Sequence, residues 1–294
     1  MKKILLLIAL ILVTALAQAQ LTVQVIWPFD PGANHASIVR ALIDNANKTQ
    51  NKYQFVFVNK SGAGGIIAAN AVLNSTELTL LANSSSFYTA PYLLKESYDT
   101  DQFKIITEIC SDRPLAVYTK NLNIFNGNKK EVTVGIVPGT VFSLLTNIIN
   151  RNENGVKILE IPYKGTNQSL IDLLSNNLDA NVNWLSVSNS QQDLKILGIT
   201  GKKSVARIPT FQSQKIKGLD ELVVDLFIFT NSKISVDIQK ELYQILTSSH
   251  NTQTNQLCES DFGVVTKPNF NSLDKIHKEN KERWKNLTSG FKPQ

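Results

Sequence analysis

The chain has 294 residues, of which 43% are hydrophobic, enough apolar material for an ordinary buried core. Thirty basic residues exceed 24 acidic residues, which gives a formal net charge of +6 at pH 7. The densest basic runs, Lys202-Lys203 and residues 278–285, are short, and we interpret them as solvated faces. A nucleic-acid-binding protein usually has a strong basic cluster with interleaved aromatic residues, so we expect no nucleic acid as a partner.

The N-terminus has the pattern of an export signal. Lys2 and Lys3 precede an uncharged, largely apolar run at residues 4–17, and Ala17-Gln18-Ala19 is a small-residue cleavage motif. Cleavage after Ala19 removes 19 residues and two lysines, which leaves 275 residues with 28 basic against 24 acidic. The run is shorter than the roughly 18 to 20 residues that cross a bilayer, and no cysteine stands at the cleavage point to carry a lipid. We therefore expect an untethered, monomeric protein in the periplasm.

Short strand-like runs alternate with helix-like runs, a pattern typical of α/β lobes with mostly parallel sheets. In the first part of the mature chain the predicted strands are residues 21–27, 53–58, 78–82 and 115–119, and the predicted helices are 36–47 and 66–73. Ile38, Leu42 and Ala46 form the buried stripe of the first helix. The hydroxyl-rich segment 83–86 is predicted as a loop.

Residues 121–130 are polar and lack periodicity, which predicts a crossover into a second lobe. Beyond it the predicted strands are residues 132–137, 156–161 and 194–200. One predicted helix follows Gly139, a second ends near Asn176, and two more cover residues 240–247 and 273–287. The two C-terminal helices are expected to pack back onto the first lobe. Lobe 1 then comprises residues 20–120 and 226–294, and lobe 2 comprises residues 121–225.

Two of the predicted strand–turn–helix junctions have the chemistry of an anion site. The first N–H groups of a helix lack intrahelical partners and carry partial positive charge, so they attract a carboxylate. Gly32 and Gly139 stand at these junctions, and glycine lets the main chain approach a ligand closely. One junction from each lobe would clamp a small carboxylate at the carboxyl ends of the strands. Two ordinary βα turns would have the same spacing.

Four segments in this order resemble the Bug-type receptors of tripartite tricarboxylate transport systems. They are Pro28-Phe29-Asp30-Pro31-Gly32 with Arg40; residues 58–65; Pro162-Tyr163-Lys164-Gly165 with Asp172-Leu173-Leu174; and residues 196–200 with Arg207, Pro209 and Thr210. The resemblance spans most of the mature chain. It implies the two-lobed periplasmic-binding-protein fold of type II, with a ligand cleft between the lobes. The implied ligand is a small carboxylate, namely a dicarboxylate or tricarboxylate, an aromatic acid or an acidic amino acid.

The resemblance also implies how the ligand is held and passed on. Main-chain N–H groups of the loop after the first strand and of the Gly139 loop would grip the carboxylate. By position, the implied ligand-binding residues are Phe29, Gly32, Ala33, Asn34, His35, Ser84, Ser85, Gly139, Thr140, Val141, Asn183 and Trp184. Lobe closure would follow binding, and membrane subunits of a tripartite permease are the implied partner. No catalytic residue, metal or cofactor is expected.

The chain departs from the family pattern at three places. Ala33 and Ala36 stand where the family usually has a second glycine and an aspartate in the first loop. The stretch between residues 121 and 132 is short for the family, and phenylalanines near Leu226 replace the usual tryptophan. These departures concern the ligand more than the lobes.

Several polar residues stay open between two interpretations. His35 is either a hydrogen-bond donor to a ligand carboxylate or an exposed loop residue. Lys60 and Lys164 either supply distal charge or are only solvated. The glycine turn 62–65 lacks the third glycine of a dinucleotide fingerprint, and the next strand ends in Asn83 rather than in an acid. We interpret that turn as tight packing of a helix on the sheet.

Enzyme and metal classes are weakly supported. There is no Gly-x-Ser-x-Gly elbow, and the three histidines stand in unrelated contexts. The alternative function is a secreted α/β hydrolase, with a triad assembled from distant positions, or a sensor protein that uses the same cleft. Isolated cysteines and the lack of a His-x-x-x-His pair argue against a metal site. Cys110 and Cys258 would meet an oxidising compartment, where geometry decides whether they pair.

Overall fold

The structure is a computed structural model that describes residues 20–32, 34–125, 130–152 and 157–291. The predicted export signal, residues 1–19, lies outside the described residues. Within the described ranges no helix combines the length and the apolar character needed to span a bilayer. The fold is mixed α/β, with helices packed against a ten-stranded sheet.

The helices and strands have the following bounds. The strands are β1 Leu21–Trp27, β2 Tyr53–Asn59, β3 Thr79–Ser84, β4 Phe103–Thr119, β5 Glu131–Ile136, β6 Lys157–Pro162, β7 Ala180–Trp184, β8 Lys195–Ile199, β9 Val223–Asn231 and β10 Val264–Val265. The α-helices are α2 Asn34–Thr49, α3 Ile66–Leu73, α4 Ser86–Leu93, α5 Val141–Arg151, α6 Thr166–Leu174, α7 Val236–Ser248, α8 Thr252–Ser260 and α9 Leu273–Leu287. The hydrogen-bonded strand order is β2-β1-β3-β9-β4-β7-β5-β6, and β8 and β10 also pair with β4.

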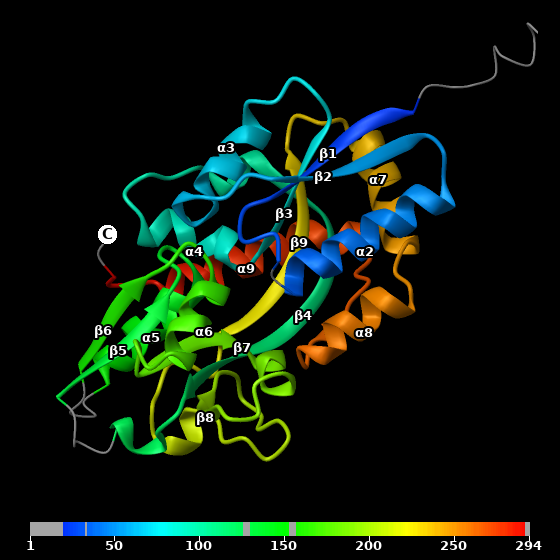
Figure 1. Ribbon diagram of the computed structural model, residues 1–294. Coiled ribbons are helices and arrows are strands. Elements are labelled where there is room, and N and C mark those ends of the chain that lie inside the picture. The colour runs from blue at the N-terminus through cyan, green and yellow to red at the C-terminus, as the bar shows by residue number, and fades with distance from the viewer. Residues whose placement is uncertain (1–19, 33, 126–129, 153–156, 292–294) are drawn as a thin grey trace, which may run out of the picture.

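Strand β4 divides the sheet into two halves. Its residues 103–114 pair antiparallel with β9, which in turn borders the parallel group of β3, β1 and β2. Its residues 115–119 pair instead with β7 and β8, next to the parallel pair β5 and β6. We call these parts the first half and the second half. Strands β4 and β9 run side by side through the middle of the molecule (Figure 1), so one pair of strands carries the chain across the junction.

The first half buries both faces of its sheet. The side chains of Val23 and Val25 belong to one core cluster, together with Ile38 and Leu42 of α2. Ile26 of the same strand belongs to the other cluster, which includes α3 and α4. Residues 25–27 of this strand are buried on both faces, and there its apolar residues form a continuous run rather than an alternation. The predicted buried stripe of the first helix is confirmed.

Most predicted elements are present, and the errors have physical reasons. The prediction of a loop at residues 83–86 is wrong, because β3 continues through Ser84 and α4 begins at Ser86. Serines are tolerated there because their backbone and hydroxyl groups find partners, such as the N–H of Asp225, which donates to Ser85 Oγ at 2.9 Å. The strand predicted at 115–119 is only the end of the 17-residue β4. Strands β7, β9 and β10 and helices α4 and α8 were not predicted.

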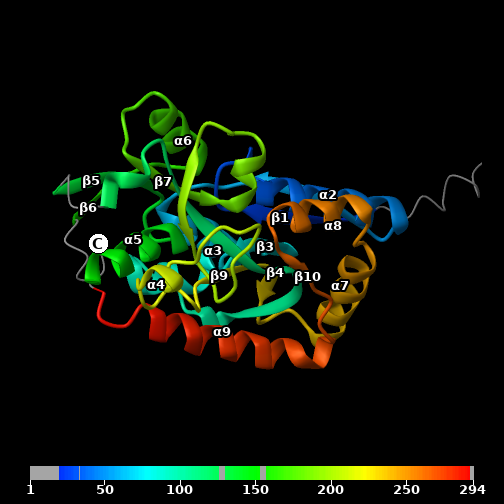
Figure 2. The ribbon, with the colours of Figure 1, turned by 90° about the horizontal axis from the view of Figure 1, so that it is seen from below.

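The C-terminal helices return to the first half. Helix α9 contacts β4 and α4, and it lies along one face of the molecule in Figure 2. Helix α8 packs on α2, and a disulfide between Cys110 of β4 and Cys258 fixes it there, with a Cα–Cα distance of 5.9 Å. The sequence left this pairing open. The bond places the loop after α8 beside the middle of β4.

Removing the disulfide should destabilise the fold strongly, because the bond closes a loop across a sequence separation of 148 residues. The loop-entropy relation predicts a loss of about 3 to 5 kcal/mol in the free energy of unfolding for the double variant Cys110→Ala/Cys258→Ala. Urea unfolding of the oxidised mature chain and of the variant measures it. A loss below about 1 kcal/mol would contradict the described pairing.

Candidate ligand-binding cleft

A small cavity lies where the two halves of the sheet meet. Its volume is about 30 Å³, which is room for about one or two water molecules. Both halves contribute to its wall, which is formed by Trp27, Phe29, Asp30, His35, Ser84, Ser86, Val137, Phe142, Lys164, Gly165, Thr166 and Trp184. Strands β1, β3 and β7 end in wall residues, and β5 ends one residue before Val137. The cavity is therefore at the carboxyl ends of the strands, where α/β proteins bind ligands.

The loop after β1 is held in place beside the cavity. Asn59 Nδ2 donates hydrogen bonds to the carbonyl oxygens of Trp27, at 3.1 Å, and Phe29, at 2.6 Å. Arg40 of α2 donates to the carbonyl oxygen of Pro31 at 2.6 Å. Side chains from β2 and α2 thus fix the main chain of this loop before any ligand binds.

The first turns of α2 and α5 come from opposite halves and reach the same cavity. His35 is the second residue of α2, Phe142 is the second residue of α5, and both side chains are part of the wall. Thr140 caps α5, and its hydroxyl accepts a hydrogen bond from the Phe142 N–H at 3.3 Å. Neither helix has an acidic residue in its first turn. No acidic residue of their own first turns therefore offsets the partial positive charge of these helix ends, and the carboxylates of Asp30 and Asp261 lie near the end of α2.

A buried charged cluster adjoins His35. The imidazole Nε2 contacts Arg113 Nη1 and lies 3.3 Å from Asp261 Oδ2, and the three residues are at most 2% exposed. Arg113 Nε donates to the carbonyl oxygen of Val224 in β9 at 3.2 Å, and its Nη2 has no hydrogen-bond partner among the described residues. Burial lowers the pKa of His35 to about 4, with the charge of Arg113 acting in the same direction. The imidazole is thus neutral at pH 7.

Aromatic rings from both halves pack between the two helix ends. The rings of His35 and Trp184 are 3.7 Å apart between centroids, and Phe142 meets Trp184 edge to face at 5.1 Å. The guanidinium carbon of Arg113 lies 5.3 Å from the centroid of the Trp184 ring. These contacts close the cleft and leave only the small cavity.

Two contacts join the halves beside the cavity, one between side chains and one between main-chain segments. Asp30 accepts hydrogen bonds from its own loop, at the Gly32 N–H (2.8 Å), and from Asn167 Nδ2 of α6 (3.1 Å). Gly64 lies against the other half: a Cβ at this position would be 3.1 Å from the carbonyl oxygen of Pro138 and 3.4 Å from Gly139 Cα. The turn that we interpreted as helix-on-sheet packing is at Gly64 a contact between the halves.

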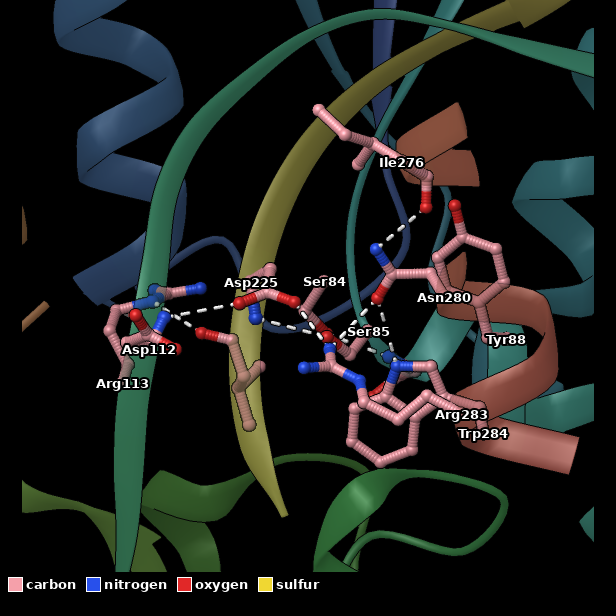
Figure 3. A network of polar contacts seen from close by, with 12 residues as sticks. Ser84, Ser85, Tyr88, Asp112, Arg113, Asp225, Ile276, Asn280, Arg283 and Trp284 are labelled. Atoms are coloured by element: carbon pink, nitrogen blue, oxygen red, sulfur yellow. Dashed lines mark hydrogen bonds and ion pairs between the residues drawn. The ribbon is translucent and has the colours of Figure 1, made fainter. Parts of the chain in front are cut away.

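A polar network connects the floor of the cleft with α9 (Figure 3). Asp225 of β9 pairs with Arg283 and accepts the Asp112 N–H at 3.1 Å, and its own N–H donates to Ser85 Oγ. Arg283 also donates to Asn280 Oδ1 at 2.8 Å. Strands β3, β4 and β9 are thereby fixed to one another at the point where the sheet changes halves.

The structure brings part of the predicted site together. Four predicted ligand-binding residues are part of the wall, namely Phe29, His35, Ser84 and Trp184. Five more are buried and lie within two sequence positions of a wall residue, namely Ser85, Gly139, Thr140, Val141 and Asn183. Gly32 is exposed, Ala33 lies outside the described residues, and of Asn34 only the backbone at the start of α2 is described.

The structure distinguishes the three basic residues whose roles the sequence left open. His35 is buried in α2, so the interpretation as an exposed loop residue is wrong. Lys164 is part of the wall, and Lys60 is exposed and is not part of it. Sequence reasoning missed Arg113 and Asp261. A basic residue inside an apolar strand was the only available signal for Arg113, and Asp261 had none.

Among the described residues no group of three or more His, Cys, Asp or Glu side chains has a geometry that would hold a metal ion. The cluster at His35 contains one imidazole, one carboxylate and a guanidinium, and a guanidinium cannot ligate a cation. The arrangement suits an anion near the helix ends rather than a metal.

Sequence comparison identifies the class of protein. Residues 38–291 match a family described as "Tripartite tricarboxylate transporter family receptor". A relative from Cupriavidus necator, the UPF0065 protein in the gbd 5' region, is 27% identical over 201 residues. That match covers 61% of this chain and 59% of the relative, so it spans less than two thirds of the relative's length.

Solved structures share the fold over nearly the whole chain. The periplasmic binding protein BugD has a TM-score of 0.81 at 20% identity, covering 93% of this chain and 99% of that chain. A protein of R. palustris solved with adipate has a TM-score of 0.81 at 18% identity, covering 94% and 100%. The predicted periplasmic-binding-protein fold is confirmed.

We expect Gly64→Ala to destabilise the chain more than Gly290→Ala. Both glycines have a left-handed backbone, with φ of 58° and 79°, so alanine costs about 1 kcal/mol at either position. Only at position 64 would the new Cβ also collide, 3.1 Å from the Pro138 oxygen, whereas at position 290 the nearest atom is 3.5 Å away. Urea unfolding should show a loss of about 2 to 4 kcal/mol for Gly64→Ala and about 1 kcal/mol for the control. Equal losses would contradict the described contact.

Stability should fall as the pH drops from 6.5 toward 4. Burial lowers the pKa of His35 and of His250 to about 4, so in this window the unfolded chain takes up protons that the folded chain does not. Burial raises the pKa of Glu108 to about 7. The folded chain therefore takes up a proton at Glu108 before the unfolded chain does, which stabilises the fold as the pH falls and offsets the loss caused by one of the two histidines.

The variant His250→Leu tests this balance, since the His250 ring nitrogens have no hydrogen-bond partner among the described residues. It should recover about 2 kcal/mol at pH 4.5 relative to the wild type and leave stability at pH 7.5 almost unchanged. Urea unfolding at both pH values provides the measurement. An unchanged acid slope would show that His250 is not buried in its neutral form.

Proposed function

The chain belongs to the receptor family of tripartite tricarboxylate transporters, and on that premise we propose that it is an extracytoplasmic solute-binding protein that captures a small carboxylate. The observation that carries the proposal is the cavity shared by the first turns of α2 and α5, which come from opposite halves of the sheet. Helix N-termini are ready anion sites. The structure of similar fold solved with adipate supports a carboxylate as the ligand class.

Binding requires the halves to separate and close again. The cavity of about 30 Å³ leaves room for only one or two water molecules, so the described structure corresponds to a closed state in this proposal. We place lobe 1 at residues 20–120 and 226–294 and lobe 2 at residues 121–225. At Leu115, β4 stops pairing with β9 and begins to pair with β7. The proposed hinge is therefore β4 at this point together with the segment before β9, which would bend as the halves separate.

Export and delivery complete the proposal. The mature chain begins after Ala19, acts as a monomer in the periplasm, and presents its closed form to membrane subunits of a permease. A hydrolase that used this cleft would need a nucleophilic hydroxyl hydrogen-bonded to the histidine of the wall, His35. In the described ranges no serine hydroxyl is hydrogen-bonded to that imidazole. Nothing in the cleft favours that alternative over ligand capture.

The proposal is tested with refolded mature chain, because refolding removes any ligand acquired during expression. Mono-, di- and tricarboxylates, aromatic acids and acidic amino acids are screened by thermal shift. A true ligand at 100 times its Kd stabilises the folded state by about 2.7 kcal/mol, which is a rise of about 5 to 10 °C in Tm for a chain of this size. X-ray scattering should show compaction with the same ligand. No stabilisation by any acid at millimolar concentration would contradict the proposal.

Lys164 should contribute to ligand affinity and Lys60 should not. Lys164 is the lysine in the cavity wall, whereas Lys60 is an exposed lysine after β2 that is not part of the wall. Titration calorimetry should show that Lys164→Met lowers the affinity for the acid identified in the screen by about threefold to tenfold, the range expected for a partly screened charge. Lys60→Met is the matched control and should stay within error of the wild type. Equal effects of both substitutions would mean that only overall charge matters.

A further inference from the structure

The loop after α8 places a buried carboxylate where the two halves of the sheet meet. Asp261 is fully buried. Its Oδ2 lies 3.3 Å from His35 Nε2 in the first half, and its Oδ1 accepts a hydrogen bond at 3.3 Å from the Ser186 N–H in the turn after β7, in the second half. Burial acts to raise the pKa of this carboxyl, but the neighbouring His35 and Arg113 outweigh it and hold the pKa below its usual value, so the group is ionised at pH 7. One carboxylate therefore contacts both halves.

The position of Asp261 is fixed relative to the first half. Its own N–H and the N–H of Gly263 both donate to the carbonyl oxygen of Cys258, each at 3.1 Å. The disulfide joins Cys258 to Cys110 of β4, and β10 returns to the same place, where Val265 pairs with Cys110. The carboxylate would therefore stay with the first half if the second half moved away.

The main chain that donates to Asp261 is fixed to the second half. The Tyr118 hydroxyl donates to the carbonyl oxygen of Trp184 at 3.0 Å and accepts a hydrogen bond from the Ser188 N–H at 3.1 Å, so it holds the chain on both sides of Ser186. Tyr118 belongs to the part of β4 that pairs with β7 and β8. Opening at the proposed hinge would thus separate Ser186 from Asp261.

This hydrogen bond is stronger than the other polar contact described between the halves. Asn167, which donates to Asp30, is exposed, and water replaces such a bond at little cost when the halves separate. The bond from the Ser186 N–H ends on a charged acceptor that is shielded from water, which strengthens it. A hydrogen bond to a charged group changes an equilibrium constant by about tenfold to a hundredfold. The contact at Asp261 is therefore large enough to shift the balance between open and closed forms.

We propose that Asp261 acts as a clasp, which holds the two halves closed through the Ser186 N–H and sets the ratio of closed to open chains. The clasp consists of protein groups alone, so it acts whether or not an acid is bound. It also raises the affinity for any ligand that binds the closed form, because apparent affinity increases with the fraction of chains already in the binding-competent state. The inference concerns closure and does not depend on which ligand the cleft takes.

The first test removes the donor and leaves the carboxylate in place. Ser186→Pro deletes the N–H, because proline has none, whereas Ser186→Ala keeps it and is the matched control. X-ray scattering of the refolded mature chain, without added acid, should give the same radius of gyration for the wild type and Ser186→Ala and a larger one for Ser186→Pro. The ratio of open to closed chains fitted to the scattering should rise about tenfold or more. Equal radii for the three chains would overturn the inference.

A second set of variants changes the acceptor, in case proline disturbs the turn. Asp261→Asn keeps an oxygen that can accept the N–H and Asp261→Ala keeps none, so the radius of Asp261→Asn should lie between those of the wild type and Asp261→Ala. Asp30→Asn changes the exposed contact and should stay closed. A residue that only stabilised the fold would lower the free energy of unfolding in urea without changing the scattering of the folded chain. That result for Asp261→Ala would contradict the clasp.

The scattering experiment separates this inference from the proposed function because it uses no ligand. Unchanged radii would remove the clasp and leave carboxylate capture standing. A failed thermal-shift screen with the expected changes in radius would remove carboxylate capture and leave the clasp standing.

Discussion

The buried guanidinium of Arg113 connects the proposed hinge of this protein to its candidate cleft. It stands two residues before Leu115, where β4 changes its pairing from one half of the sheet to the other. It donates to β9, contacts His35, and leaves no space for a side chain at Gly263, whose Cβ would lie 2.6 Å from Arg113 Cγ. A buried charge is tolerated only where its surroundings are fixed around it. The disulfide at Cys110 and the network around Asp225 provide that rigidity.

Much of the fold could be predicted from the sequence because its signals are local. The run 21–27 became β1 with the predicted bounds, and Ile38, Leu42 and Ala46 are buried as the helical spacing indicates. The prediction failed where tertiary contacts override local pattern. The serines at 84–86 look like a loop in sequence, yet they end β3 and begin α4 because β9 supplies partners for them.

The candidate site was only partly accessible from the sequence for the same reason. Phe29 belongs to a segment that resembles the family, and His35 and Trp184 were carried over from that resemblance by position, so their place at the cavity could be anticipated. Arg113 and Asp261 are separated from His35 by 78 and 226 positions, and no spacing rule connects them. Only the long-range pairing of β4 with β9 and the disulfide bring them together. Local patterns therefore could not indicate the charged residues that contact His35.

The protonation state of His35 tests the account most directly. The chain has only three histidines, so ¹⁵N-histidine-labelled protein gives few imidazole signals, and the spectra of His35→Gln and His250→Leu assign them. The account predicts that His35 at pH 7 is neutral and is the one histidine whose nitrogen shifts move when a carboxylate binds. A charged imidazole, or ligand-induced shifts confined to the other histidines, would contradict it.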